Sequence, residues 1–319
     1  MDLSEVWTEK YRPRSLSDVV GHAEIVARLR GFVESGSIPH MLFAGPAGTG
    51  KTTTAIAVSR ELFGDQWRYN FLEKNASDER GIDVVRSTIK NFARTKAIGT
   101  AFKIIFLDEC DALTRDAQNA LRRTMENYSL TCRFILSCNY SSRIIDPIQS
   151  RCAVFRFARL TPDGVKKMAE RIRDGENLKM GDKAMAAVVD LSRGDLRRTV
   201  NVLQASAALG KEITEDEVYQ ITSELKGGEV RDVLTTALEG DFLVARGKLQ
   251  DLMITRGMAG EDVVRAIHRA VLVLDVAEET KVTILDRLGE YEFRMAEGAN
   301  EYIQLDALLA NLTILGKRS

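Results

Sequence analysis

The sequence has little proline, little histidine and no surplus of charge of either sign. Its 319 residues include 5 Pro, 3 His and 4 Cys, and 45 basic residues stand against 46 acidic ones. This composition, with 45% hydrophobic residues, excludes a collagenous, mucin-like or disordered chain and indicates a globular protein. The length corresponds to about two domains, or three small ones. The net charge by itself gives no reason to expect a nucleic-acid partner.

Long apolar runs are also missing. The run around Val271–Leu274 is far shorter than the roughly 18 residues that cross a bilayer. The N-terminus carries charge from its second residue and has no apolar core of a secretory signal. We therefore expect a cytoplasmic protein with no membrane contact.

The few cysteines and histidines do not have the spacing of metal ligands. No two cysteines form a C-x-x-C pair, and the histidines are scattered. We expect the cysteines to be small buried side chains in a reducing compartment, and we expect no zinc site. The residues concerned are Cys110, Cys132, Cys138, Cys152, His22, His40 and His268.

Short apolar runs alternate with helix-like stretches in the first half of the chain. Because such runs are bounded by polar, Gly or Pro residues, they predict buried strands of an α/β fold with a largely parallel sheet. The predicted strands are 41–44, 103–108, 133–139 and 153–157, with 70–75 as a weaker candidate.

After Thr161-Pro162 the pattern becomes helical to the end of the chain. Apolar residues recur with helical spacing at 230–238 and again at 305–312. Gly227-Gly228 predicts a hinge between two helical pieces, because paired glycines stop a helix. We thus expect an α/β domain at 1–161, a helical domain at 162–226 and a second all-helical domain at 229–319.

One segment matches the phosphate-binding pattern G-x-x-x-x-G-K-[ST] directly after a predicted strand and before a helix-like stretch. Its glycines let backbone N–H groups surround phosphate oxygens at a helix N-terminus. Lys51 would neutralise β- and γ-phosphate charge, and the Thr52 hydroxyl would bind Mg²⁺. The segment consists of Gly45, Pro46, Ala47, Gly48, Thr49, Gly50, Lys51 and Thr52.

Asp108 and Glu109 end the 103–108 strand, at the sheet edge where ligands bind in open α/β folds. Asp108 suits the Mg²⁺ shell, and Glu109 suits polarisation of an attacking water. Asn139, at the end of another strand, could reach the γ-phosphate, although such an asparagine is more often a turn former. Arg151 and Arg197 are by spacing alone ordinary surface charges.

A second basic feature is a stripe in the helix-like stretch at 86–94. Arg86, Lys90 and Arg94 recur every four residues and share one face, with Arg80 shortly before them. The stripe could follow nucleic-acid phosphates, or it could be a solvated helix face. Aromatic residues are sparse in it, so stacking on bases is not indicated.

These segments together resemble the small subunits of archaeal and eukaryotic replication factor C, which are AAA+ clamp loaders. The resemblance covers nearly the whole chain, and a generic ATPase would share only the phosphate loop and the acidic strand end. Beyond the phosphate loop it is carried by EKYRP (9–13), VVG (19–21), NASDERGIDVVR (75–86), FLDECDALT (106–114), ALRRTME (120–126), FILSCNYSSRIIDPIQSRCAVFRF (134–157), GDLRRTVNVLQ (194–204) and EGANEYIQLDALLA (297–310).

The resemblance implies roles for individual residues. Asn139 would be sensor 1, Arg197 would be sensor 2 on the lid at 162–226, and Arg151 would be the arginine finger inserted into the neighbouring subunit's site. Tyr11, Arg12 and Val20 would border the adenine pocket. The helical segment at 229–319 would form the oligomeric collar, and the basic stripe would face the DNA backbone.

The implied activity is Mg²⁺-dependent ATP hydrolysis that loads a sliding clamp onto primer-template DNA, in a nucleoid-associated complex. The implied partners are the clamp-loader large subunit, other small subunits, the sliding clamp and the DNA. Alternatives are another AAA+ machine, such as a branch-migration or protein-remodelling motor, and a structural subunit that binds nucleotide without hydrolysing it. Two residues depart from the family pattern: Ala47 replaces a usual proline, and His22 replaces a usual glutamine.

Overall fold

The computed structural model describes residues 6–77, 85–210, 212–222 and 224–317. The chain divides into two compact units, residues 1–212 and 213–319. The first unit holds the sheet and the helices that follow it directly, and the second is helical. The three-part division at 161 and 226 stays a prediction.

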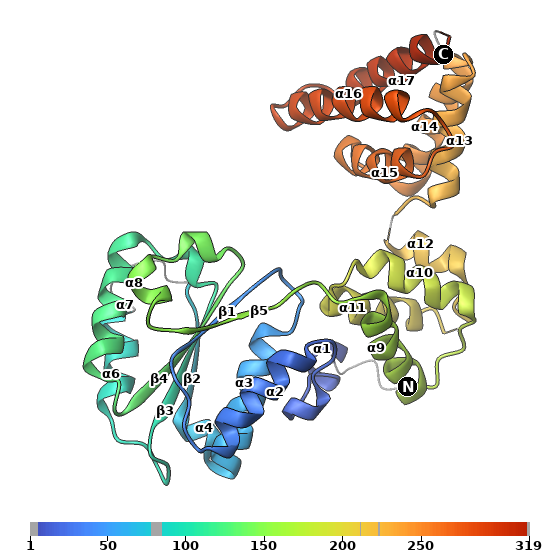
Figure 1. Ribbon diagram of the computed structural model, residues 1–319. Coiled ribbons are helices and arrows are strands. Elements are labelled where there is room, and N and C mark those ends of the chain that lie inside the picture. The colour runs from blue at the N-terminus through green and yellow to red at the C-terminus, as the bar shows by residue number, and fades with distance from the viewer. Residues whose placement is uncertain (1–5, 78–84, 211, 223, 318–319) are drawn as a thin grey trace. The chain divides into compact units, whose positions relative to one another are not determined.

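The first unit is built on a parallel sheet with strand order β2-β3-β4-β1-β5 (Figure 1). Its strands are β1 (Met41–Ala44), β2 (Phe71–Asn75), β3 (Lys103–Asp108), β4 (Cys132–Cys138) and β5 (Ala153–Arg156). Every predicted strand is confirmed, and so is the α/β class. β1, β3 and β4 are nearly continuously buried, as expected for a parallel sheet that is covered on both faces.

Helices cover both faces of this sheet (Figure 1). The described helices of the unit are α1 (Trp7–Lys10), α2 (Ala23–Glu34), α3 (Lys51–Phe63), α4 (Trp67–Asn70), α6 (Lys90–Arg94), α7 (Arg115–Asn127), α8 (Asp146–Gln149), α9 (Pro162–Gly175), α10 (Asp182–Ser192) and α11 (Leu196–Ala207). Single turns connect them: η1 (Leu16–Asp18), η2 (Gly64–Gln66), η3 (Val85–Ile89), η4 (Cys110–Ala112) and η5 (Ser141–Arg143).

Side chains alternate between the two faces of each strand, so each face has its own core. Phe43 and Phe106 pack with residues of α2 and α3 on one face. Leu42 and Leu136 pack with residues of α7 on the other. Cys110, Cys132 and Cys138 are buried and Cys152 is half-buried, and all four are free thiols. Burial raises the pKa of Cys132 and of Cys152 to about 12, which suits inert core side chains.

The strand register brings three chain segments to one edge of the sheet. Ala44 pairs with Cys138, and Leu107 pairs with Leu136. The residues that follow β1, β3 and β4 therefore lie side by side at the carboxyl edge.

Helices α9 to α11 follow the sheet within the same compact unit. Thr161 caps α9 by accepting a hydrogen bond from the Gly164 amide at 3.3 Å, with Pro162 in the first turn. Asp195 caps α11 by accepting a hydrogen bond from the Arg198 amide at 3.0 Å.

The second unit is an all-helical cluster, as expected. Its described helices are α12 (Glu215–Thr222), α13 (Gly227–Leu238), α14 (Phe242–Arg256), α15 (Gly260–Leu272), α16 (Glu278–Ala296) and α17 (Glu301–Gly316). The two predicted apolar stripes lie on α13 and α17 and form its core, including Val233, Leu234, Leu308 and Leu309.

The expectation that the paired glycines lie outside a helix and stop it is wrong, and the hinge itself stays a prediction. Gly227 and Gly228 form the first turn of α13, where the Lys226 amide donates to the Glu229 carboxylate at 2.9 Å. This capping contact and the burial of Val230 offset the low helix propensity of glycine.

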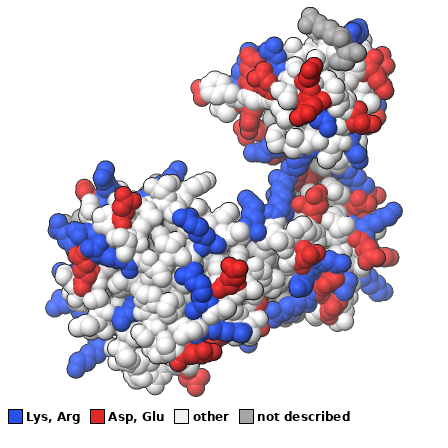
Figure 2. All heavy atoms as spheres, viewed as in Figure 1, with Lys and Arg blue, Asp and Glu red and all other residues white. Residues whose placement is uncertain are grey.

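Among the described helices, none is long and apolar enough to span a bilayer. On the face seen in Figure 2, basic and acidic side chains are interspersed on both units, in keeping with the balanced composition.

Candidate nucleotide-binding site

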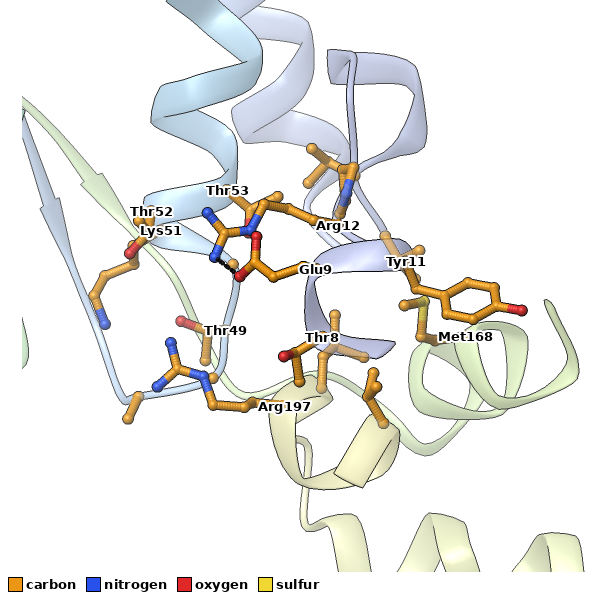
Figure 3. Close-up of a pocket in the computed structure, with 18 of the residues that line it drawn as sticks. Thr8, Glu9, Tyr11, Arg12, Thr49, Lys51, Thr52, Thr53, Met168 and Arg197 are labelled. Carbon is orange, nitrogen blue, oxygen red and sulfur yellow. Dashed lines mark hydrogen bonds and ion pairs between the residues drawn. The ribbon is translucent and has the colours of Figure 1, made fainter. Parts of the chain in front are cut away.

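A cavity of about 460 Å³ opens at the carboxyl edge of the sheet (Figure 3). Its walls come from the N-terminal segment, the phosphate loop, the ends of β3 and β4, and helices α9 and α11. The lining residues are Thr8, Glu9, Tyr11, Arg12, Pro13, Val19, Val20, Ala47, Gly48, Thr49, Gly50, Lys51, Thr52, Thr53, Asp108, Glu109, Asn139, Met168, Leu196, Arg197 and Val200. The cavity therefore gathers most of the predicted site residues.

The phosphate loop, residues 45–50, connects β1 to α3. Gly45 has φ of 154°, and a Cβ there would lie 2.0 Å from the Phe157 carbonyl oxygen. Gly48 has φ of 72°, and a Cβ there would lie 1.8 Å from the Asp195 carboxylate. Both positions thus need glycine for backbone conformation and for close approach. The first N–H groups of α3 have no partner within the helix and lie next to the loop, so this helix N-terminus favours a bound anion.

Lys51 lies at the start of α3 with its ammonium group held by oxygen atoms. Its Nζ donates to the carbonyls of Gly45 at 2.7 Å and Pro46 at 2.8 Å, and to Oδ1 of Asn139 at 3.2 Å. Burial lowers the pKa of Lys51, the Asp108 carboxylate opposes that effect, and the Arg197 guanidinium adds to it. Lys51 and Asn139, each expected from the sequence near the γ-phosphate, are thus in direct contact.

Thr52 and Asp108 form the second direct contact of the site. The Thr52 hydroxyl donates to Asp108 Oδ2 at 2.6 Å, which joins the start of α3 to the end of β3. A hydroxyl beside a carboxylate is a donor set that Mg²⁺ uses when phosphate oxygens and waters supply the other ligands. The described residues contain no group of three or more His, Cys, Asp or Glu that could hold a metal ion. The hydroxyl and carboxylate of Thr52 and Asp108 are the donor set that fits a magnesium ion bound together with a phosphate ligand.

Glu109 lines the cavity and has an unusual backbone conformation. Its φ of 53° lies in the left-handed region, and its amide donates to Asp108 Oδ1 at 3.0 Å. Non-glycine residues in this region are uncommon and cluster at functional sites. The conformation turns the chain sharply after β3 and leaves the Glu109 side chain at the cavity wall.

The start of α11 bonds directly to the phosphate loop. The Leu196 amide donates to the Gly48 carbonyl at 3.0 Å. Arg197, the next residue, lines the cavity, and its guanidinium points toward the same side as the Lys51 ammonium (Figure 3). Sequence spacing alone left Arg197 as a surface charge, whereas the fold places it beside Lys51.

The N-terminal segment forms another wall with Tyr11, Arg12 and Val20. Arg12 forms an exposed ion pair with Glu9 on this wall (Figure 3). The Tyr11 hydroxyl donates at 2.7 Å to Glu176, just after α9. All three residues expected at the adenine pocket thus lie on the cavity.

Arg151 is not among the residues that line this cavity. It follows α8, and its guanidinium pairs with Glu126 of α7 at 2.7 Å. The side chain is 38% exposed. A contribution of Arg151 to nucleotide chemistry therefore requires a cavity on another molecule.

Three of the four residues of the predicted basic stripe lie in helical segments that the structure describes. Lys90 and Arg94 are exposed on α6, and Arg86 belongs to the preceding turn η3. Arg80 lies outside the described residues.

Sequence reasoning missed other residues that support the site. His22 is buried and contacts the Thr49 carbonyl at 2.9 Å. Asp111 accepts hydrogen bonds from the amides of Asn139 at 3.3 Å and Tyr140 at 3.2 Å, and so fixes the end of β4. The repeated acid in the segment LDECD was the one available signal for Asp111.

Comparison with known proteins agrees with this geometry. Residues 41–160 match the ATPase family associated with various cellular activities (AAA), and residues 228–311 match the replication factor C C-terminal domain. The structure resembles the Thermotoga maritima RuvB Holliday junction branch migration motor with a TM-score of 0.56 and 19% identity, over 82% of this chain and 90% of that one. The likeness to RuvB is one of fold. The fold and the site thus define an AAA+ ATPase.

The full-length relatives are more specific. The chain is 55% identical to the replication factor C small subunit of Methanocella arvoryzae, over 98% of this chain and 97% of that protein. It is also 55% identical to the replication factor C small subunit of Archaeoglobus fulgidus over the whole of both chains. The chain belongs to the replication factor C small-subunit family. This membership confirms the expected clamp-loader ATPase subunit and does not favour a branch-migration motor, a remodelling motor or a non-hydrolysing subunit.

Proposed function

We propose that the chain binds ATP and Mg²⁺ in the cavity and hydrolyses the ATP with help from an arginine of the neighbouring subunit. In this proposal the complex contains a large subunit and other small subunits, and it places a sliding clamp on primer-template DNA. Residues 162–226 act as the lid and residues 229–319 as the collar that joins subunits.

The observation that carries the proposal is the convergence of Lys51, Asn139, Thr52 and Asp108 through two direct contacts. Lys51 has oxygen partners that phosphate oxygens can replace, since an ammonium group is a donor to any of them. Asn139 can then turn its amide to the terminal phosphate or to a water. The contacts of the Lys51 ammonium group would therefore differ between the states with and without a terminal phosphate.

Mg²⁺, when bound, would neutralise the negative charge that develops on the phosphate oxygens during hydrolysis. Thr52 and Asp108 would hold the ion, and Glu109 would orient and polarise the attacking water. Arg197 would add positive charge from the lid. Tyr11, Arg12 and Val20 would enclose the base against the apolar side chains of Met168 and Val200.

Arg151 completes the site of the adjacent subunit in this proposal. It is exposed and lies away from the cavity of its own chain, so the geometry supports a role in trans. An arginine supplied in trans contributes on the order of 10³ to 10⁵ in rate. Loss of the terminal phosphate would release the contacts of Lys51, Asn139 and the neighbour's Arg151 and so relax the assembly.

The test is the turnover of an assembled complex that carries Arg151→Ala, in the presence of clamp and primed DNA. We expect the ATPase rate to fall by about 10³ or more, with ATP binding nearly intact. Arg173→Ala is a matched control, because Arg173 is an arginine on α9 whose ion pair with Asp174 is exposed. Unchanged turnover of Arg151→Ala would overturn the proposed site between subunits.

A further inference from the structure

Glu126 holds two arginines at the end of α7. Its Oε1 lies 2.7 Å from Nη2 of Arg151 and 3.2 Å from Nη1 of Arg122. Arg122 belongs to the same helix one turn earlier, whereas Arg151 comes from the segment after α8. Glu126 therefore connects α7 to the predicted arginine finger.

Within its own helix Glu126 gains only the exposed pair with Arg122, one turn earlier. It lies in the last turn of α7, where the helix macrodipole disfavours a carboxylate. The acid is 37% exposed, so burial does not fix it there either. The interactions of the Glu126 carboxylate are its ion pairs with Arg122 and Arg151.

We propose that Glu126 is a positioning residue for Arg151. The inference rests on the proposed role of Arg151 in the neighbouring subunit's site. In this proposal Glu126 orients the Arg151 guanidinium toward the neighbouring subunit before the guanidinium contacts a nucleotide there.

The geometry of the guanidinium supports this role. Nη1 of Arg151 donates to the Pro147 carbonyl at 2.6 Å, while Nη2 pairs with Glu126. Two different nitrogens are thus held by two different elements, α8 and α7. Nη1 also lies 3.4 Å from the Ser150 hydroxyl oxygen. Because the guanidinium is a rigid planar fork, two fixed nitrogens define its plane.

The charge arrangement leaves Arg151 available as a cation. One carboxylate is shared by two guanidinium groups, so the cluster keeps one net positive charge. An exposed carboxylate pair is weak enough for a phosphate to compete with it. Glu126 can therefore orient the arginine without neutralising the cluster.

The test compares four forms of the assembled complex with clamp and primed DNA: wild type, Glu126→Gln, Arg151→Ala and the double variant. Glutamine keeps the shape of Glu126 and removes its charge. We expect Glu126→Gln to lower kcat about 5-fold or more, with KM for ATP unchanged, because it affects only how the arginine is presented. Glu126→Asp should recover part of the rate.

In the Arg151→Ala background, Glu126→Gln should cause no further loss in single-turnover hydrolysis. Glu170→Gln on α9 is the matched control, because Glu170 also makes an exposed pair, with Lys166. Thermal unfolding and size-exclusion chromatography would establish that each variant folds and assembles.

The outcomes separate the two proposals. If Arg151→Ala keeps its turnover, the proposed role of Arg151 is wrong. If Arg151→Ala loses turnover while Glu126→Gln keeps its kcat, only the role of Glu126 is wrong. A further loss in the double variant would also overturn that role, because Glu126 would then act on something other than Arg151.

Discussion

The imidazole of His22 lies 2.9 Å from the carbonyl oxygen of Thr49 and supports the phosphate loop from behind. His22 precedes α2 and is 8% exposed, and burial lowers its pKa. The neutral ring therefore donates its Nε2 proton to the carbonyl. The Thr49 hydroxyl donates to the Pro46 carbonyl at 2.9 Å, which closes the loop on itself.

We predict that His22→Ala weakens nucleotide affinity several-fold and lowers the free energy of unfolding by about 1–2 kcal/mol, since a buried carbonyl loses its donor. Titration calorimetry with ATP and thermal unfolding would measure the two effects. His22→Gln, which restores a donor, should behave nearly as wild type. Equal affinity for His22→Ala and wild type would contradict the supporting role.

The contact between Tyr11 and Glu176 gives a second prediction. Glu176 is 6% exposed and accepts from the Tyr11 hydroxyl at 2.7 Å and from Lys10 Nζ at 2.6 Å. Glu176→Gln should loosen the N-terminal wall of the cavity, so we expect the Kd for ATP to rise several-fold with kcat little changed. Tyr11→Phe should shift the Kd in the same direction. A change in kcat alone would show that Glu176 acts elsewhere.

His40 predicts how stability depends on pH. Its Nδ1 accepts from the Phe134 amide at 3.1 Å. Burial lowers its pKa to about 4, the charge of Arg133 contributes to the lowering, and a hydrogen bond with the Met125 backbone opposes it. The unfolded chain binds this proton below its ordinary value of 6.5, whereas the folded chain binds it only near 4. The stabilisation is therefore complete above 6.5 and is lost as the pH falls toward 4.

We expect this histidine to account for roughly 1–2 kcal/mol of that loss, after allowance for its partial exposure. His40→Asn keeps an acceptor for the Phe134 amide and removes the titration. Denaturant unfolding of the wild type and of His40→Asn at several pH values would isolate the difference. Exposed His268→Asn is the control, and a wild-type slope in His40→Asn would refute the assignment.

The basic stripe makes a prediction about DNA affinity. Joint replacement of Arg86, Lys90 and Arg94 with Ala should weaken binding of the assembled complex to all duplex sequences alike. The slope of log K against log salt should become shallower by up to about 3, since each phosphate contact contributes about 0.9. Exposed Lys166→Ala on α9 serves as the control. An unchanged slope would show that the stripe is only a solvated face.

Local sequence patterns were enough to predict which residues meet at the carboxyl edge of the sheet. The phosphate loop is a contiguous motif, and a parallel sheet aligns the ends of its strands, so Lys51, Asp108 and Asn139 could be grouped from sequence. The strands themselves were visible because β1, β3 and β4 are buried on both faces. Each of these three site residues belongs to a short contiguous pattern, so its position could be predicted without knowledge of distant contacts.

Contacts between distant segments could not be predicted in the same way. Tyr11 and Glu176 are 165 residues apart, and no spacing rule connects them. The support of His22 for the loop likewise depends on how α2 packs against α3. The paired glycines gave a wrong expectation because only their low helix propensity was considered. In the structure they begin α13, where the burial of Val230 and the capping contact of Glu229 outweigh that propensity.

The hydrogen bond from the Leu196 amide to the Gly48 carbonyl is made by main chain on both sides. Parting α11 from the loop must break that bond or pull the loop along with the helix. Any movement that separates α11 from the loop is therefore opposed by a main-chain hydrogen bond, and this opposition does not depend on which side chains surround the cavity.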